Sequence, residues 1–293
     1  MSAQLFHDID QIREMLARVR RMRATIGLVP TMGALHEGHG RLIETARRET
    51  DCVVVSVFVN PIQFDRPDDL ARYPRTLAAD QSFSEAHGAD IVFAPSEEAM
   101  YPQQQRAFVE VARVGDELCG RFRPGHFRGV ATVVLKLLNI TQPDRAYFGE
   151  KDAQQLAVIR RMTRDLNLPV EIVPVPTARD SDGLALSSRN GHLSVDERQI
   201  APILFQSLLL SQKLIAGGSS NAADVKAAAL AVLGRQPLAR VEYLEIVDPE
   251  DMQPVERIAG PVRVAGAIWV GSTRLIDNML CEPEPSGEPG LIQ

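Results

Sequence analysis

The sequence has little cysteine, no long apolar run and no excess of basic charge, and each absence excludes a class of protein. Its 293 residues include three widely spaced cysteines, which argues against a disulfide framework and favours a reduced, cytoplasmic compartment. The longest apolar run, CVVVSVFV at 52–59, is too short to span a bilayer, and the N-terminus has no apolar segment typical of a secretory signal. A net charge of -6 disfavours nucleic acid as the main partner.

Common catalytic signatures are also missing. The sequence contains no G-x-G-x-x-G, no G-x-x-x-x-G-K-[ST], no H-E-x-x-H, no C-x-x-C and no nucleophile elbow. A dinucleotide fold, a P-loop, a structural zinc and a covalent nucleophile are therefore disfavoured. The candidate groups that remain are histidines, a lysine, hydroxyls and an arginine. Such a set fits phosphoryl or nucleotidyl transfer, in which a protein mainly positions the reactants and neutralises charge.

Strand-like and helix-like segments alternate over the first part of the chain, with short connections. We expect strands at 25–30, 52–59, 89–95, 145–149 and 170–176, and helices at 8–23, 39–48, 76–87, 127–140 and 153–166. The run at 52–59 is rich in β-branched residues and continuous, as in a strand buried on both faces of a parallel sheet. The alternation predicts a doubly wound parallel sheet, a Rossmann-like α/β domain at 1–180.

The pattern changes after residue 180 and predicts a smaller α+β domain at 181–282. Ser194 is a candidate N-cap with Glu197 at the capping-box position, and Gly271 with Ser272 indicates a hairpin. The expected elements are helices at 195–215 and 221–234, then strands at 240–248, 262–271 and 273–281. The tail at 283–293 is rich in Pro, Gly and Glu, which predicts disorder.

The stretch PTMGALHEGH at 30–39 follows the first expected strand and opens a helix. Ligands of doubly wound sheets bind at the carboxyl ends of the strands, where the backbone N–H groups and the dipole of a helix N-terminus attract anions. Gly33 and Gly38 would let the backbone approach a phosphate. His36 and His39, three residues apart, share one face of the turn and can donate to phosphoryl oxygens. The alternative is an ordinary turn that carries surface histidines.

Polar groups follow other strands and suit the same chemistry. In FGEKDAQQ at 148–155, Lys151 can meet a phosphate and Asp152 a ribose hydroxyl. LALSSRN at 184–190 offers two hydroxyls and the guanidinium of Arg189, which together make an anion clamp. Taken alone, each segment also fits a solvated turn or linker.

Two more segments are candidates for substrate recognition. FVNPIQF at 58–64 places Asn60 and Gln63 after the strongest strand, where neutral amides suit a hydroxyl or a carboxylate. RFRPGHFRG at 121–129 is a local basic cluster that contains Arg123. Turn chemistry at Asn-Pro and a solvated basic loop are the alternatives.

Taken in order, PTMGALHEGH, FVNPIQF, YPRT, RPGHFRGVATVV, FGEKDAQQL and DGLALSSRNGHL resemble the motifs of the pantothenate synthetase (pantoate–β-alanine ligase) family. The resemblance spans residues 30 to 193, and RLIDNML near the C-terminus also matches. This family belongs to the nucleotidyltransferase superfamily of class I aminoacyl-tRNA synthetases. HEGH stands where that superfamily has H-I-G-H, and LSSR stands where it has a mobile K-M-S-K-S-type loop.

The resemblance implies a two-step, ATP-dependent condensation of pantoate with β-alanine to pantothenate, with release of pyrophosphate and AMP. Pantoyl adenylate would be the intermediate, no covalent link to the enzyme is needed, and Mg²⁺ is expected with the triphosphate. The family also implies a homodimer in the cytoplasm, with the smaller domain closing over the active site.

The resemblance further implies roles for individual residues. The catalytic residues would be His39 as proton donor, His36 and Lys151. The ATP-binding residues would be Met32, Gly33, His36, Gly38, His39, Gly149, Lys151, Asp152, Ala178, Leu186, Ser187, Ser188 and Arg189. The pantoate-binding residues would be Gln63, Gln155 and Arg123, and β-alanine would meet Gln63 and Tyr73. Asp80 matches an acidic position linked to metal.

One departure and two rival functions remain open. Gly40 stands where the family usually has Leu, and a glycine there would weaken the helix by up to ~1 kcal/mol. One rival is another nucleotidyltransferase with a phosphate substrate, which the neutral amides at Gln63 and Gln155 disfavour. The other rival is a regulatory nucleotide-binding module, which would not need the full set of Lys151, His39 and Arg189.

Overall fold

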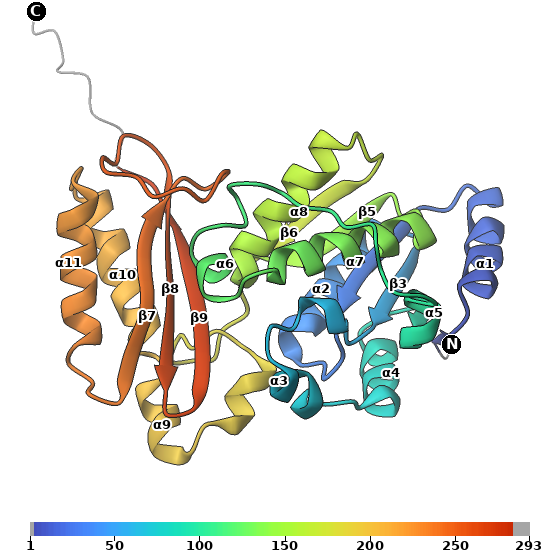
Figure 1. Cartoon of the computed structure of the whole chain (residues 1–293), viewed down its shortest axis with the longest axis horizontal. Coiled ribbons are helices and arrows are strands. Elements are labelled where there is room, and N and C mark those ends of the chain that lie inside the picture. Colours follow the sequence, from blue (N-terminus) through green and yellow to red (C-terminus); the bar gives the residue numbers. More distant parts are fainter. Residues whose placement is uncertain (1–2, 284–293) are drawn as a thin grey trace, which may run out of the picture. The chain divides into compact units, whose positions relative to one another are not determined.

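The computed structural model describes residues 3–283, so most of the tail predicted to be disordered lies outside the described residues. Six parallel strands form one sheet in the order β1-β4-β3-β2-β5-β6. Figure 1 labels β3, β5 and β6 of this sheet. Their bounds are β1 Gln4–Phe6, β2 Ile26–Thr31, β3 Cys52–Val57, β4 Ile91–Phe93, β5 Arg145–Gly149 and β6 Glu171–Val175. The predicted doubly wound parallel sheet is confirmed.

Helices and short 3-10 turns connect these strands. They are α1 Ile9–Arg21, α2 Glu37–Glu49, η1 Pro61–Gln63, α3 Pro67–Arg72, α4 Leu77–Ala86, α5 Glu97–Met100, α6 Cys119–Phe122, α7 His126–Thr141, η2 Glu150–Asp152 and α8 Ala153–Asp165. The chain runs from β2 outward through β3 and β4 on one side, and through β5 and β6 on the other. The strand order therefore reverses between β2 and β5, the place where such sheets bind ligands.

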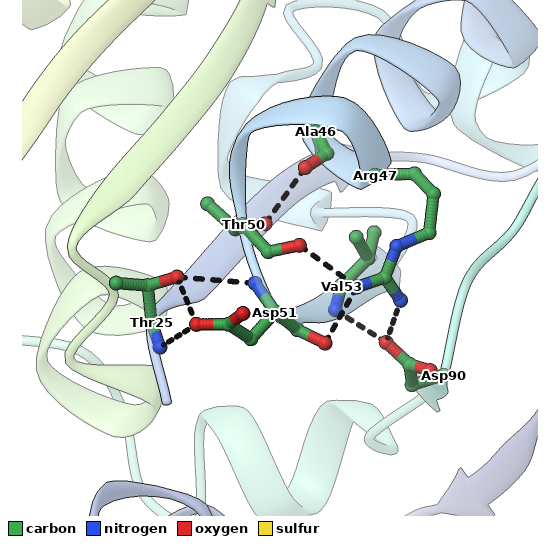
Figure 2. A network of polar contacts seen from close by, with 7 residues as sticks. All are labelled: Thr25, Ala46, Arg47, Thr50, Asp51, Val53 and Asp90. Atoms are coloured by element: carbon green, nitrogen blue, oxygen red, sulfur yellow. Dashed lines mark hydrogen bonds and ion pairs between the residues drawn. The ribbon is translucent and has the colours of Figure 1, made fainter. Parts of the chain in front are cut away.

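The edge at which the strands begin is held by a repeated contact. One aspartate directly precedes each of β3, β4 and β5, and its carboxylate accepts a backbone N–H at the start of the neighbouring strand. Asp51 accepts from Thr25 at 2.8 Å, Asp90 from Val53 at 2.8 Å and Asp144 from Ile26 at 2.7 Å. Arg47 joins two of these points, with an ion pair to Asp90 at 2.7 Å and a hydrogen bond to the Asp51 carbonyl (Figure 2).

The second sheet is antiparallel and has the order β7-β8-β9, with bounds Ala239–Val247, Val262–Val270 and Thr273–Cys281. Gly271 turns the β8–β9 hairpin with a φ of 58°, as the sequence predicted. Helices α10 Ile203–Ala216 and α11 Ala222–Leu233 pack on this sheet. The predicted smaller α+β part is therefore present.

The sequence predicted a single helix at 195–215, and this prediction is wrong because the segment forms two helices. The chain forms α9 Val195–Ile200 and then α10, which begins directly after Pro202. Proline has no backbone N–H and its ring opposes a continuous helix, so the helix divides at this residue. The capping box of Ser194 and Glu197 at the start of α9 is confirmed.

The chain contacts divide the protein into two compact units. The first comprises the chain up to Asp180 together with Leu186–Ser188, and the second comprises Ser181–Ala185 and the chain from Arg189 onward. The segment Leu186–Ser188 thus groups with the parallel sheet although it follows the predicted boundary. Within residues 3–283 no helix is long and apolar enough to cross a membrane.

Candidate active site

The loop that follows β2 has an unusual backbone, and a buried carboxylate holds it. Gly33 and Ala34 have positive φ values of 81° and 52°. Asp80, which is 2% exposed on α4, accepts the N–H of Ala34 at 3.2 Å, the N–H of Leu35 at 2.8 Å and the hydroxyl of Thr76 at 3.1 Å. A Cβ at Gly33 would lie 2.9 Å from the Asp80 carboxylate, so only glycine fits this close approach. Asp80 is therefore an anchor of the loop.

Two histidines form the start of α2. His36 is the N-cap, and its Nδ1 accepts the N–H of Gly38 at 3.1 Å. The Nδ1 of His39 accepts the N–H of His36 at 3.3 Å, which completes a capping box made of two imidazoles. The ring centroids lie 4.2 Å apart with a tilt of 49°. The predicted pairing of the two side chains on one face is thus present.

Both imidazoles are neutral at pH 7. Burial and then the positive charge of Lys151 lower the pKa of His36 to about 4. Burial, His36 and Lys151, in that order, lower the pKa of His39 to about 3. Because each Nδ1 accepts a backbone N–H, the single proton of each ring is on Nε2. The pair therefore offers two neutral N–H donors rather than two positive charges.

The loop that follows β5 reaches the same place. Lys151 belongs to η2, and its charge acts on the pKa of both histidines. The charge of Asp152 opposes the lowering of the pKa of His36 and also acts on His126. At Gly149, the last residue of β5, an added Cβ would meet no atom within 4 Å. The ends of β2 and β5 thus bring the candidate phosphate-binding groups together.

A third segment of the predicted nucleotide site borders the histidines. The N–H of Leu186 donates to the carbonyl of Ala178 at 2.9 Å. A Cβ at Gly38 would lie 3.8 Å from the Cβ of Leu186, so the segment LSS comes next to HEGH. Ser187 and Ser188 belong to the same short segment of the first unit. Arg189 falls in the second unit, and its role stays a prediction.

Gln63, at the end of η1, links this turn to the loop after β2. Its side chain is 7% exposed, and its Nε2 donates to the sulfur of Met32 at 3.1 Å. Its backbone carbonyl accepts from Nδ1 of His126 at 2.8 Å and from Arg123 at 3.4 Å. Arg123 also pairs with Asp65 at 3.1 Å, so its guanidinium holds the segment that follows Gln63.

The two adjacent glutamines of α8 have different surroundings. Gln154 is 7% exposed, and its amide accepts the N–H of Cys119 and donates to the carbonyls of Val114 and Glu117. Gln155 is half-buried, and its side chain makes no hydrogen bond to any of residues 3–283. Gln154 is therefore structural, while the amide of Gln155 is available to a ligand.

Tyr73 and a cavity lie near the loop after β2 and η1. Tyr73 directly follows α3 as its C-cap and packs edge-on against Phe64, with ring centroids 5.7 Å apart. A cavity of about 440 Å³ borders Met32 and Gly33 and is also lined by Phe58, Thr76 and Asp80. Its volume lies within the range of small-molecule sites.

Some partners of the site were not apparent in the sequence. Asn60 bonds to Gln63 and to Tyr101, which lies 41 residues further along the chain. Asp65 and His126 hold the segment around Gln63, and nothing in their local patterns predicted this. These contacts depend on where η1, α5 and α7 meet, which a local motif does not encode.

Comparison with known proteins agrees with these motifs. The family model described as pantoate-beta-alanine ligase matches residues 4–280. The chain belongs to the pantoate–β-alanine ligase family. The family predicted from the sequence is therefore confirmed, and with it the class of enzyme, a ligase.

Relatives resemble the chain over nearly its whole length. The pantothenate synthetase of Heliobacterium modesticaldum is 53% identical over 277 residues, which cover 94% of this chain and 99% of the relative. That of Moorella thermoacetica is 50% identical over 279 residues, covering 95% and 99%.

Solved structures agree with the fold. A crystal structure of pantothenate synthetase from Thermus thermophilus has a TM-score of 0.89 and 45% identity, and covers 94% of this chain and 98% of that one. The pantoate-beta-alanine ligase of Francisella tularensis, complexed with beta-gamma ATP and beta-alanine, has a TM-score of 0.79 and 35% identity, and covers 95% and 98%.

Proposed function

We propose that this ligase condenses pantoate with β-alanine to pantothenate, using ATP, through a pantoyl adenylate. The observation that carries this proposal is the pair of neutral histidines beside Lys151 where the strand order reverses. Two N–H donors and one cation suit the oxygens of a triphosphate. Membership in the family and the coverage of its members support the activity and disfavour the rival nucleotidyltransferase and the regulatory module.

The ATP site would extend from the loop after β2 to η2. His36 and His39 would donate hydrogen bonds from Nε2 to phosphoryl oxygens. Lys151 would add a positive charge, and His39 would also act as the proton donor. Gly38 and Gly149 would let the backbone approach the nucleotide, and Asp152 would bind a ribose hydroxyl. The remaining ATP-binding residues would be Met32, Gly33, Ala178, Leu186, Ser187, Ser188 and Arg189.

Pantoate would lie between two neutral amides, those of Gln63 and Gln155. The side-chain NH₂ of Gln63 can donate to a hydroxyl or carboxylate oxygen, and the side chain of Gln155 is available for the same purpose. Arg123 would act at this end, although its bonds to Asp65 and Gln63 favour an indirect role. Tyr73 and Gln63 would meet β-alanine.

The chemistry would proceed by two displacements. A carboxylate oxygen of pantoate attacks the α-phosphorus of ATP and displaces pyrophosphate. The amine of β-alanine then attacks the acyl carbon and displaces AMP, which forms the amide. The chain's own groups hold the phosphates and orient the two acceptors, so proximity and charge stabilisation account for the acceleration.

Mg²⁺ would arrive as part of the nucleotide substrate. Among residues 3–283 there is no group of three or more His, Cys, Asp or Glu side chains placed to hold a metal. Asp80, the predicted metal residue, already accepts three hydrogen bonds. Mg²⁺ commonly takes one or two carboxylates besides substrate phosphates, and when bound it would neutralise charge on the triphosphate. The donor set fits a metal carried by ATP and does not fit a resident one.

We also propose a cytoplasmic homodimer in which the unit at 181–282 closes over the active site of the unit at 1–180. Family resemblance supports these statements. The grouping of Leu186–Ser188 with the first unit is compatible with a closing segment at this point.

Pyrophosphate release tests the proposed function. Purified protein with ATP and Mg²⁺ should release pyrophosphate only when pantoate is added, and should form AMP and pantothenate only when β-alanine is also present. Release without pantoate, or no release with it, would contradict the two-step reaction. Measuring the first step without β-alanine separates the adenylate from a concerted route.

A further inference from the structure

We propose that Tyr101 is a positioning residue for pantoate, which acts through Asn60 to fix the end of the Gln63 amide that faces the substrate. The inference rests on the proposed contact between Gln63 and pantoate. It adds Tyr101, and it gives Asn60, which the sequence offered as a candidate for substrate recognition, a positioning role instead of a direct contact.

Three side chains form a continuous line of hydrogen bonds. Tyr101 follows the last residue of α5, and its hydroxyl donates to Oδ1 of Asn60 at 2.7 Å. Nδ2 of Asn60 donates to Oε1 of Gln63 at 2.9 Å and to the carbonyl of Gly129 at 3.2 Å. Nε2 of Gln63 is then the end that is left, and it lies 3.1 Å from the sulfur of Met32.

The direction of these bonds is forced by one group. The carbonyl oxygen of Gly129 can only accept, so the NH₂ of Asn60 must face it. The same NH₂ faces Gln63, so the oxygen of the Gln63 amide must point toward Asn60. An Asn60 amide turned by 180° would oppose two oxygens at Gly129. Gln63 therefore presents its NH₂, a donor suited to an oxygen of a hydroxy acid.

Tyr101 completes the arrangement by satisfying the other end of Asn60. Asn60 is 1% exposed, and a buried amide oxygen without a donor is strongly unfavourable. Burial, and then the negative charge of Glu97, hold the pKa of Tyr101 above its usual value, so the hydroxyl remains a donor at every working pH. Without this hydroxyl, the buried Oδ1 of Asn60 loses its donor and the orientation of the amide loses one of its two determinants.

The backbone around Gly129 explains why the line is rigid. A Cβ at this position would collide with the carbonyl of Ile62 and would lie 2.7 Å from Cα of Gln63. The first turn of α7 therefore lies directly against η1, and only glycine permits the approach. The acceptor that orients Asn60 is thus fixed in the framework of the protein.

Tyr101→Phe removes the hydroxyl and keeps the ring, which packs near Phe58 and beneath Lys136. The KM for pantoate should rise roughly three- to tenfold, the effect of one lost orienting hydrogen bond, while the KM for ATP should stay within about twofold. Tyr147→Phe is the matched control, because the hydroxyl of this buried tyrosine bonds to Glu49. The control should leave both KM values unchanged.

A double-variant cycle separates this inference from the function on which it rests. If Tyr101 acts through Gln63, Tyr101→Phe should have no further effect on the pantoate KM in a Gln63→Ala background. An additive effect, or an unchanged pantoate KM in Tyr101→Phe alone, would overturn the inference and leave the role of Gln63 intact. An unchanged pantoate KM in Gln63→Ala would instead refute the proposed contact with pantoate.

Discussion

The Nδ1 atom of His39 accepts the backbone N–H of His36 at 3.3 Å, so the second histidine of the motif caps the helix that the first begins. One imidazole therefore has a structural bond at Nδ1 and a chemical role at Nε2. Replacing it by alanine removes both functions, and the two effects would be confused in a single measurement.

His39→Gln separates these functions. Glutamine is a preferred residue at the third position of a capping box, and its side-chain oxygen can accept the same N–H. We expect His39→Gln to fold with nearly normal thermal stability and to lose pyrophosphate release, whereas His39→Ala should also lose about 0.5–2 kcal/mol of stability. Pyrophosphate release and thermal denaturation of both variants test this. Near-normal turnover in His39→Gln would refute the assigned role.

The stability of the ligand-free protein should decrease as the pH falls below 6.5. His36, His39 and His126 have folded-state pKa values lowered to about 4, 3 and 4, mainly by burial. Between pH 6.5 and these values the unfolded chain binds protons that the folded chain refuses, so protons favour unfolding. Above pH 6.5 their contribution is fully present, and below about pH 3 it changes no further.

Urea denaturation at pH 7.5, 6 and 4.5 measures this loss, and histidine NMR signals identify the groups. Replacing His126 should reduce the loss of unfolding free energy between pH 7.5 and 4.5 by the part that His126 contributes. An imidazole of His36 or His39 that titrates near pH 6.5 in the free protein would contradict the neutral pair.

Asp80→Asn tests whether Asp80 is an anchor or a metal ligand. An amide keeps the shape, but its NH₂ cannot accept the N–H of Ala34 or Leu35, so the loop should shift. We expect a loss of about 1–3 kcal/mol in stability and at least roughly a tenfold lower kcat/KM for ATP.

Titration with Mg²⁺ distinguishes the two roles of Asp80. A lost metal ligand would be partly rescued by more Mg²⁺, whereas a displaced loop would not. Thr76→Val is the milder control, since it removes one hydrogen bond and keeps the carboxylate. Recovery of Asp80→Asn at high Mg²⁺ would favour the metal role.

The adjacent glutamines of α8 should respond differently to the same change. Gln155→Ala should raise the KM for pantoate and leave the unfolding free energy nearly unchanged, because this amide has no bond within residues 3–283. Gln154→Ala should destabilise the protein by about 1–3 kcal/mol, because it leaves buried partners at 114–119 unsatisfied. Steady-state kinetics and urea denaturation of both variants test this pair. A shift only in the KM for ATP would refute the placement of Gln155.

Local patterns in the sequence predicted what short-range physics determines. The continuous β-branched run before Asn60 predicted a buried parallel strand, and the polar residues after β2 and β5 predicted the edge at which they meet. The three-residue strand β1 was missed, because its pairing with β4 leaves no period in so short a segment. The break at Pro202 was visible in the sequence, but the apolar pattern continued through it.

Contacts between segments far apart in the chain could not be predicted from the sequence. The weakening of α2 by Gly40 stays a prediction, and the structure adds that this glycine is buried against the ring of His87, where a Cβ would lie 2.6 Å from the imidazole. The glycine and the histidine thus occupy one shared space that neither segment reveals alone. The hydrogen bonds from Ala34 and Leu35 to Asp80 were missed for the same reason, since these residues lie 46 and 45 positions away from it.

The aspartates before β3, β4 and β5 have a consequence for how such an enzyme can change. Each ties the beginning of its strand to a neighbour. Arg47 joins the aspartates before β3 and β4 (Figure 2). Every candidate catalytic group instead follows the end of a strand. Strand alignment is thus secured on the side away from the chemistry. Loops on the reactive side do not have to align the strands, so a change in their sequence can alter which substrates are bound without disturbing the sheet.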